Sequence, residues 1–339
     1  MTNDIKKIKK ITNRTSQGQA GKWKVDIGDK TYLIKENVIT EEIVSIGWGE
    51  SKVDIETTSN ISEVVAYRIG RYFGLNTQPY HLMKSTELNI ETKSSNLVVC
   101  EFIHYTVNLA QAVDNFKGRE VFDTEVILKT AIKLGVTRKS LLQVLLFDAL
   151  IGNSDRHLNN FLLEKCPSNT LKMNHIIDNG NSLLYNKETF ATYDDKAKPI
   201  KETHTEQIKF LDKYIKEELP IFNIYSDLKQ FMTYIETDKE IVEAFKIMNN
   251  PEKVNEIKKM LKHNYFKFID KYIQKPYILL DKYKKDSINC CSLLDKTNNN
   301  IYEVTEQKLI EDIKTGRGVD NLKLVNRKGK IYVSKIKNY

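Results

Sequence analysis

The chain has 339 residues, of which 40% are hydrophobic and 29% charged, a composition typical of a globular protein long enough for two domains. The net charge is +8, but its lysines are scattered among acidic residues, which favours a solvated surface over a dedicated nucleic-acid interface. No apolar run is long enough to span a membrane, and the polar residues 1–10 do not resemble a secretory signal. The four cysteines lack metal-ligand spacing and predict free thiols, so we expect a cytoplasmic protein.

Residues 1–104 predict a small β-rich domain with one helix. Its predicted elements are strands at residues 23–27 and 31–35, a helix at 61–73 and a strand at 96–102. A small, polar turn is expected at residues 15–22, and residues 36–59 show no clear period and predict irregular structure. Ser59-Asn60 is the expected N-cap of the helix, and Gly74 its end.

Residues 105–285 predict a larger, mostly helical domain. Residues 138–151 are apolar nearly all round, which indicates a buried helix. Short strands are expected at residues 160–163 and 175–177, on either side of a turn that contains Pro167. Further amphipathic helices are predicted at residues 210–216, 225–236, 239–248 and 251–272.

The last part, residues 286–339, predicts a small βαββ appendage. Its expected elements are a strand at residues 301–304, a helix at 305–313 and a hairpin of strands at 322–324 and 330–333. A unit of this size is near the limit for independent stability, so we expect it to pack on the main body. The whole chain therefore predicts an α+β fold in three parts.

The most informative stretch is residues 152–160, followed by the Asp-x-Gly turn that begins at Asp178. The stretch contains Asp155 and, five residues later, Asn160. Phosphoryl transfer from ATP needs a carboxylate that orients and deprotonates the attacking hydroxyl, and oxygen ligands for Mg²⁺. Apolar runs flank both segments, so the polar groups should lie on a short loop held between buried elements. Each residue taken alone is also a common turn or capping residue, but the set predicts Asp155 as catalytic base and Asn160 and Asp178 as metal ligands.

The segment Asn153-x-Asp155-Arg156-His157-x-x-Asn160, with Asp178 downstream, resembles the catalytic segment of the HipA-like serine/threonine kinases, including the short CtkA-type members. It is more distantly similar to the phosphatidylinositol kinases, which share an Asp-Arg-His catalytic loop. The resemblance covers residues 11–285 and implies a bilobal protein-kinase-like fold that holds ATP and Mg²⁺ between a small N-terminal lobe and a larger helical lobe.

The resemblance implies further roles. Lys35 would pair with the α- and β-phosphates, and Glu63 would hold its ammonium from the helix. His157 would order the catalytic loop or reach a phosphate oxygen. The other residues expected to contact ATP are the hinge residues Glu101, Phe102 and Ile103 and the loop residues Ser16, Gln17, Gly18, Gln19, Ala20 and Gly21. Lone strand lysines and helix glutamates are more often solvent-exposed, so these roles depend on the whole set.

The loop at residues 16–21 is not a Walker A sequence, but its glycines could cradle phosphates with backbone N–H groups. In HipA-like kinases a serine of this loop is autophosphorylated, which ejects the loop from the ATP pocket. Ser16 is the matching candidate, with Thr15 as its neighbour. The chain departs from the family pattern at Asn179, where the family often has an aromatic residue or an aspartate.

The leading hypothesis is an ATP- and Mg²⁺-dependent serine/threonine protein kinase. The family resemblance implies a protein substrate such as a translation component, and an antitoxin-type partner on a separate chain. A lipid or small-molecule kinase of the same fold would suit the basic charge, although no arginine-rich amphipathic helix with aromatic anchors is evident. A non-catalytic module that binds nucleic acid or protein through the basic tail is the alternative from another class. The tail lacks an RNA-binding signature, so nucleic acid is not expected as the main partner.

Overall fold

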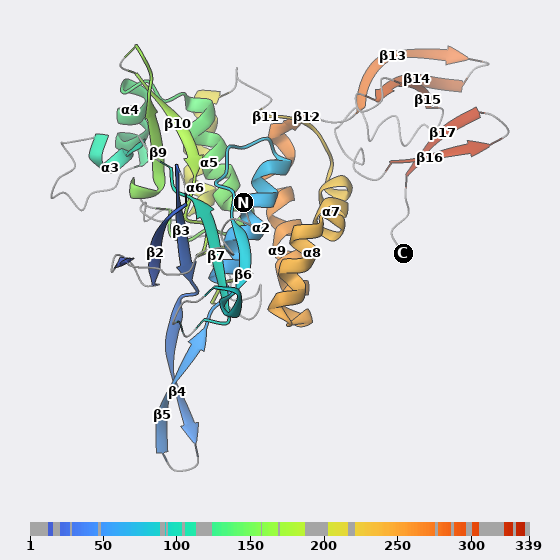
Figure 1. Ribbon diagram of the computed structural model, residues 1–339. Helices are drawn as coiled ribbons and strands as arrows, with labels where there is room; N and C mark the ends of the chain where they lie inside the picture. The colour runs from blue at the N-terminus through green and yellow to red at the C-terminus, as the bar shows by residue number, and fades with distance from the viewer. Residues whose placement is uncertain are drawn as a thin grey trace.

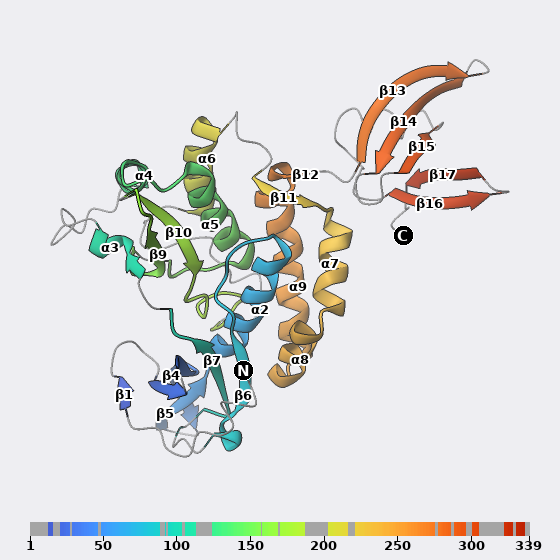
Figure 2. The ribbon, with the colours of Figure 1, turned by 45° about the horizontal axis from the view of Figure 1, so that its top comes forward.

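The computed structural model describes part of the chain, and Figures 1 and 2 show it from two directions. The described residues are 13–15, 21–27, 29–46, 49–88, 92, 94–103, 106–112, 124–156, 158–168, 170–186, 203–215, 221–274, 277–285, 288–295, 300–304, 322–327 and 330–335. Within them the chain is a mixed α and β fold, in which an antiparallel sheet is followed by several helices (Figure 1). None of the described helices has the length and apolar character needed to cross a membrane.

The N-terminal sheet has five strands in the order β1-β2-β3-β7-β6, and every neighbouring pair is antiparallel. Its strands are β1 (Asn13–Thr15), β2 (Lys22–Ile27), β3 (Lys30–Glu36), β6 (His81–Lys84) and β7 (Asn96–Glu101). Alternate residues such as Trp23 and Ile34 bury one face in a small apolar cluster. The opposite face, which includes Val98, packs with Val64 of the following helix.

A β-ribbon follows β3, where the sequence pattern predicted irregular structure. Strands β4 (Ile39–Ile46) and β5 (Gly49–Glu56) pair only with each other, and Figure 1 shows them extending away from the five-stranded sheet. The prediction for residues 36–59 is therefore wrong. A ribbon that joins no larger sheet does not have to bury one face, so it needs no period-two pattern in its sequence.

Helix α2 (Ser59–Tyr72) carries Glu63 and begins earlier than predicted. Its N-cap is Thr58, so the predicted cap at Ser59-Asn60 is wrong. These two residues lie in the first turn, where the Ser59 hydroxyl accepts from the Val38 N–H and the Asn60 amide donates to the carbonyls of Lys35 and Asn96. Their polar side chains therefore tie the helix to the sheet. Phe73 is the C-cap, and Gly74 adopts a left-handed φ of 70°, as the predicted helix end requires.

The helical region surrounds α5 (Arg138–Ile151), which is buried without interruption from Val144 to Ile151, as the apolar sequence predicted. Thr137 caps its start, and Gly152 ends it in the left-handed conformation at φ 67°. The 3₁₀ turn Leu158–Asn160 then leads into β9 (Phe161–Lys165). Two more helices, α3 (Leu109–Ala112) and α4 (Thr124–Lys133), also belong to this region. Strands β8 (Thr106–Asn108) and β10 (Leu171–Ile176) form a three-stranded sheet with β9 in the order β10-β9-β8.

Four more helices complete this region: α6 (His204–Ile215), α7 (Leu228–Thr237), α8 (Lys239–Met248) and α9 (Pro251–Asn264). Two predictions are corrected here. Residues 222–225 form strand β11 (Phe222–Tyr225), parallel to β12 (Ile273–Gln274), and α7 starts only after the capping box of Asp227. The predicted helix over 251–272 changes after Asn264 into a π-helical turn, Tyr265–Ile269, and a 3₁₀ turn, Asp270–Tyr272.

The C-terminal part forms two small antiparallel sheets, and in both views it lies to one side of the helices (Figures 1 and 2). Their strands are β13 (Tyr277–Lys285), β14 (Ile288–Asp295) and β15 (Asn300–Val304) in one, and β16 (Leu322–Arg327) and β17 (Lys330–Lys335) in the other. The strand at 301–304 and the last hairpin were predicted, but β13 was assigned to the helical part and β14 was missed. The predicted helix at 305–313 lies outside the described residues.

Candidate functional site

A cleft of about 840 Å³ lies between the five-stranded sheet, α2 and the loops on either side of β9 and β10. Residues far apart in the sequence line it, including Lys35, Glu63, Asp155, Asn160 and Asp178. The fold therefore brings together, in one cavity, the five polar residues that were predicted to act in phosphoryl transfer. Its volume is within the range of pockets that bind small molecules and cofactors.

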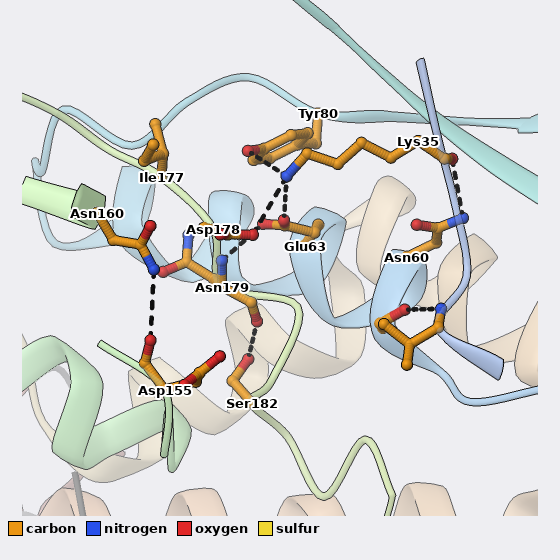
Figure 3. A network of polar contacts seen from close by, with 12 residues as sticks. Lys35, Asn60, Glu63, Tyr80, Asp155, Asn160, Ile177, Asp178, Asn179 and Ser182 are labelled. Carbon is orange, nitrogen blue, oxygen red and sulfur yellow. Dashed lines mark hydrogen bonds and ion pairs between the residues drawn. The ribbon is translucent and has the colours of Figure 1, made fainter. Parts of the chain in front are cut away.

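The buried Lys35 is the centre of an ion-pair cluster in this cleft, in which the Asp178 side chain is partly exposed (Figure 3). Its Nζ lies 3.0 Å from Oε1 of Glu63 and 3.3 Å from Oδ1 of Asp178, and it donates to the Tyr80 hydroxyl at 3.4 Å. Strand β3, helix α2 and the loop after β10 each supply one of the charged groups. Because Lys35 and Glu63 are both almost fully buried, the helix is held against the sheet by a pair that solvent barely screens.

The charges of the cluster compensate one another. Burial acts to lower the pKa of Lys35, but the carboxylate of Glu63 and the other nearby groups outweigh it and hold that pKa well above its ordinary value. The Lys35 ammonium is the main cause that holds the pKa of Asp178 at about 2, although burial opposes it. Burial instead raises the pKa of Glu63, despite its contact with Lys35. At neutral pH the cleft therefore presents an ionised lysine beside an ionised Asp178.

The loop that carries Asp178 has a specific backbone shape. Asp178 adopts a left-handed φ of 57°, a conformation that aspartate and asparagine tolerate better than most residues. The next residue, Asn179, donates its backbone N–H to Oε2 of Glu63 at 2.8 Å, so one carboxylate of α2 binds both Lys35 and this loop (Figure 3). The Ser182 hydroxyl closes the turn by donating to the Asn179 carbonyl at 2.6 Å.

Arg156 joins the loop of Asp155 to the loop of Asp178. It is only 1% exposed, and its guanidinium makes a two-point contact with Asp148 of α5 through bonds of 2.9 and 2.8 Å. The same group donates to Oδ1 of Asn179 at 2.7 Å and to the carbonyl of Ile177. The apolar runs on either side predicted that the Asp155–Asn160 segment lies between buried elements. In the structure, the single buried guanidinium of Arg156 holds that segment, the Asp178 turn and α5 together.

Three asparagines contact Asp155. The Asn153 side chain accepts from the backbone N–H of Asp155 at 3.0 Å, and the Asn160 amide donates to the backbone carbonyl of Asp155 at 3.3 Å. The Asn181 amide donates to Oδ2 of its carboxylate at 2.7 Å. The backbone and the side chain of Asp155 are therefore both held, and Figure 3 shows the Asn160 side-chain oxygen turned away from the contact with Asp155.

The hinge residues Glu101, Phe102 and Ile103 also line the cleft. The Glu101 side chain is paired on the surface with Lys30 at 2.9 Å, whereas its carbonyl accepts from the buried amide of Gln78 at 2.9 Å. The backbone N–H of Gln78 bonds to Ile176, two residues before Asp178. Gln78 thus connects the hinge to the Asp178 segment, a link that no sequence pattern indicated.

Several predicted site residues cannot be placed. Ser16, Gln17, Gly18, Gln19, Ala20 and His157 lie outside the described residues. Gly21 is described, and its backbone exchanges hydrogen bonds with Glu36 through the Glu36 carboxylate at 2.7 Å and the Glu36 N–H at 3.0 Å. Gly21 thus fixes the point at which the loop enters β2.

Gln78, Asn179 and Asn181 are site residues that were not predicted from the sequence. Asn179 and Asn181 flank the glycine of the Asp-x-Gly turn, so their position beside Asp178 was the available signal. Gln78 had no such signal, because its partner is a backbone carbonyl 23 residues away.

The donor groups fit a nucleotide-bound magnesium ion. The described residues contain no cluster of three or more histidine, cysteine or acidic side chains that could hold a metal ion by themselves. Mg²⁺ in phosphoryl-transfer sites is usually held by one or two protein oxygens together with substrate phosphates and water. The Asp178 carboxylate and the Asn160 amide oxygen are such a pair, and both residues line the cleft beside Lys35.

The comparisons with known proteins show a similar fold among solved structures. No family model matches the chain, and no curated protein matches it in sequence. Among solved structures, the chain is similar to the proinflammatory kinase CtkA of Helicobacter pylori, with a TM-score of 0.50 and 14% identity over 78% of this chain and 94% of that one. At this identity the likeness is one of fold, so the chain has a fold similar to that of a kinase.

Two further structures match with lower scores. HipA of Shewanella oneidensis MR-1, solved with HipB and its operator DNA, has a TM-score of 0.40 and 13% identity over 78% of this chain and 67% of that one. Spectinomycin phosphotransferase, solved with ADP and spectinomycin, has a TM-score of 0.24 and 12% identity over 75% of this chain and 88% of that one. Scores this low carry no argument about this chain.

Proposed function

We propose that this chain is an ATP-dependent serine/threonine protein kinase of the HipA-like type. The observation that carries the proposal is the convergence of Lys35, Glu63, Asp155, Asn160 and Asp178 on one cleft. Residues of these types at these places perform the separate tasks of phosphoryl transfer. The kinase-like fold shared with CtkA supports the proposal.

The proposed architecture is bilobal. Residues 1–104 form the small lobe, residues 105–285 the larger helical lobe, and residues 286–339 an appendage. ATP would lie between the lobes, with its base against the hinge residues Glu101, Phe102 and Ile103, which line the cleft. The loop of residues 16–21 is proposed to bind its phosphates. Lys35 binds the α- and β-phosphates, and Glu63 keeps its ammonium in place.

Asp155 is the proposed catalytic base. Its carboxylate takes the proton of the substrate hydroxyl while the hydroxyl oxygen forms its bond to the γ-phosphorus and the bond to the β-phosphate oxygen breaks, so that ADP leaves with that electron pair. Asn160 and Asp178 would hold a magnesium ion, which would supply positive charge against the phosphates. His157 is proposed to order the catalytic loop, because it lies between Asp155 and Asn160 in the sequence.

The substrate is proposed to be a protein serine or threonine in the cytoplasm, with an antitoxin-type chain as partner. The resemblance of the catalytic segment to the HipA-like kinases is what suggests such a partner. Ser16 is the proposed autophosphorylation site, because it precedes the glycines of the phosphate-binding loop.

Intact-mass spectrometry of the purified protein after incubation with Mg²⁺ and ATP tests the proposal. We expect the wild type to gain the mass of one phosphoryl group per modified site, and the Asp155→Asn and Asp178→Asn variants to gain none. Loss of the base alone should slow transfer about 10²–10⁴-fold. Peptide mapping then tests Ser16.

A second readout separates a missing substrate from a wrong assignment. Mg-ATP should raise the thermal midpoint of the wild type, because a ligand that binds only the folded state stabilises it. A protein that neither gains mass nor gains stability with Mg-ATP would contradict the kinase proposal.

A further inference from the structure

The three asparagines that contact Asp155 do not act on the same part of it. Asn153 and Asn160 bind its backbone, whereas Asn181 binds the carboxylate itself, with Nδ2 donating to Oδ2 at 2.7 Å. No other described residue hydrogen-bonds this carboxylate, so Oδ1 carries no such contact within the described part of the chain. Both Asp155 and Asn181 line the cleft. The rotation of the Asp155 carboxylate about its side-chain bonds is therefore restrained by one neutral donor.

Asn181 is itself firmly placed. Its backbone carbonyl accepts from the N–H of Ser154, the residue just before Asp155, at 3.3 Å. Two residues before it, Asn179 is bound by Arg156 and by Glu63, and two residues after it the Leu183 N–H bonds to the carbonyl of Ile151. The side-chain amide of Asn181 is thus presented by a turn that is anchored on both sides, which is what a group that orients another side chain requires.

We infer that Asn181 is a positioning residue for the catalytic base: its amide holds Oδ2 of Asp155 so that Oδ1 is turned toward the substrate hydroxyl. The inference rests on the proposed function. It adds a residue that the motif does not contain, since the motif assigns the turn only a metal ligand. It also means that one short turn, from Asp178 to Asn181, carries both the metal-binding carboxylate and the group that aims the base.

The physical basis is geometric. A carboxylate can rotate, and a base acts only when a lone pair lies within hydrogen-bond reach of the proton it removes. Small misplacements of reacting groups cost about a hundredfold in rate, so fixing one oxygen of Asp155 is worth a measurable factor. Because Asn181 touches neither the hinge nor Lys35 in any described contact, its loss should affect the chemical step rather than nucleotide affinity.

The test compares Asn181→Ala and Asn181→Asp with the wild type by the rate of ADP release at saturating Mg-ATP, which counts transfer to a protein hydroxyl and to water alike. We expect kcat to fall about ten- to hundredfold in Asn181→Ala and further in Asn181→Asp, which has no donor and places a second carboxylate beside the base. The KM for ATP and the thermal shift with Mg-ATP should stay within about twofold of the wild type.

A matched control is Asn76→Ala. Asn76 also donates one side-chain hydrogen bond, to the Asn174 carbonyl at 3.4 Å, but on the exposed surface outside the cleft. Its kcat should equal that of the wild type. A structural role of Asn181 would instead lower the thermal midpoint and raise KM together with any loss in kcat.

A double-mutant cycle shows whether Asn181 acts through Asp155. In an Asp155→Ala background, adding Asn181→Ala should change the residual rate less than about twofold, because the group that Asn181 orients is already gone. An equal loss in both backgrounds, or an unchanged kcat in the single variant, would overturn the inference and leave the proposed function standing. A wild type that neither releases ADP nor gains thermal stability with Mg-ATP would instead overturn the proposed function.

Discussion

At the scale of single residues, the candidate site depends on buried cations that are each paired with a carboxylate. Lys35 contacts Glu63 and Asp178, and Arg156 contacts Asp148, so each of these two buried cations has a carboxylate partner from another element. Breaking such a pair leaves an isolated charge in a medium that solvates it poorly. Function and stability are therefore coupled at these positions, and a change that removes one charge affects both.

Arg156 gives the sharpest prediction of this kind. The Arg156→Met variant should lower the free energy of unfolding by about 3–5 kcal/mol, because it leaves the buried Asp148 without its cationic partner and removes the bond to Asn179. Urea denaturation followed by far-UV circular dichroism measures the change. The double variant Asp148→Asn/Arg156→Met should recover part of the loss, since no unpaired charge remains. Equal stability of Arg156→Met and the wild type would contradict this role.

Lys35 gives a prediction that involves binding. The Lys35→Met variant should lose the thermal stabilisation that Mg-ATP confers on the wild type, because the phosphates lose their buried cation. Differential scanning fluorimetry with and without Mg-ATP measures it. Lys172→Met, which removes an exposed lysine paired with Glu164 on the surface, is the control and should respond to Mg-ATP as the wild type does. An undiminished shift in Lys35→Met would argue against a phosphate-binding role.

At the scale of elements, α2 makes ionic contacts to other elements near two positions along its length. Glu63 holds its N-terminal half to β3 and to the Asp178 turn. Further along, Arg68 makes a two-point contact with Asp238, the N-cap of α8, with Nη2 at 2.6 Å from Oδ2. The helix that positions Lys35 is therefore also clamped to the C-terminal helices, and the stability of that clamp should depend on pH.

The Arg68–Asp238 pair predicts a stability difference with a defined pH dependence. Burial acts to raise the pKa of Asp238, but the hydrogen bond from Arg68 and the other contacts outweigh it, and the pKa lies below its ordinary value of 3.8. A carboxylate with a depressed pKa stabilises the fold above its unfolded-state pKa, and this contribution is lost as the pH falls through the folded-state value.

Asp238→Asn keeps an N-cap but loses the ion pair, so it should lower the free energy of unfolding by about 1–2 kcal/mol at pH 7. The difference from the wild type should shrink as the pH falls below about 4, because protonation of Asp238 in the unfolded chain then favours unfolding of the wild type. Denaturation curves between pH 7 and pH 3 measure it. Glu243→Gln, which removes an exposed pair with Lys246, should change stability by less than about 0.5 kcal/mol. A difference that does not vary with pH would contradict the assignment.

The sequence predicted those elements whose pattern reflects burial. The period-two pattern of residues 23–27 and 31–35 corresponds to strands with one face in an apolar cluster, and the apolar run at 138–151 is a buried helix. The pattern failed where no such constraint operates, as in the β4–β5 ribbon. It also failed at the α2 cap, because Ser59 and Asn60 have the right chemistry for a cap but bond to Val38 and to strands β3 and β7 instead.

At the scale of the whole molecule, the described residues that line the cleft all precede position 182. Within the described part of the chain, strands β13 to β17 contribute no lining residue, and they form sheets with one another. Both views show the two small sheets to one side of the helices (Figures 1 and 2). We therefore expect the candidate site to assemble without the C-terminal part.

A shortened protein tests this separation. A chain that ends at Gln274 keeps β12 and every residue that lines the cleft, so Mg-ATP should stabilise it by the same shift in thermal midpoint as the full chain. Differential scanning fluorimetry over a range of Mg-ATP concentrations compares the two. A shortened chain that folds cooperatively but no longer responds to Mg-ATP would show that the C-terminal sheets support the nucleotide site.

The sequence by itself determined the chemical inventory of this protein: an aspartate, an asparagine and an Asp-x-Gly turn at fixed spacing, a strand lysine and a helix glutamate. These follow from local order, because the loop and the turn are short and flanked by apolar runs. Only the tertiary structure decided which groups meet. The contacts Lys35–Asp178, Gln78–Glu101 and Asn181–Asp155 join residues that are 143, 23 and 26 positions apart. Such pairs leave no periodic signal, since it is the packing of the buried elements that brings them together.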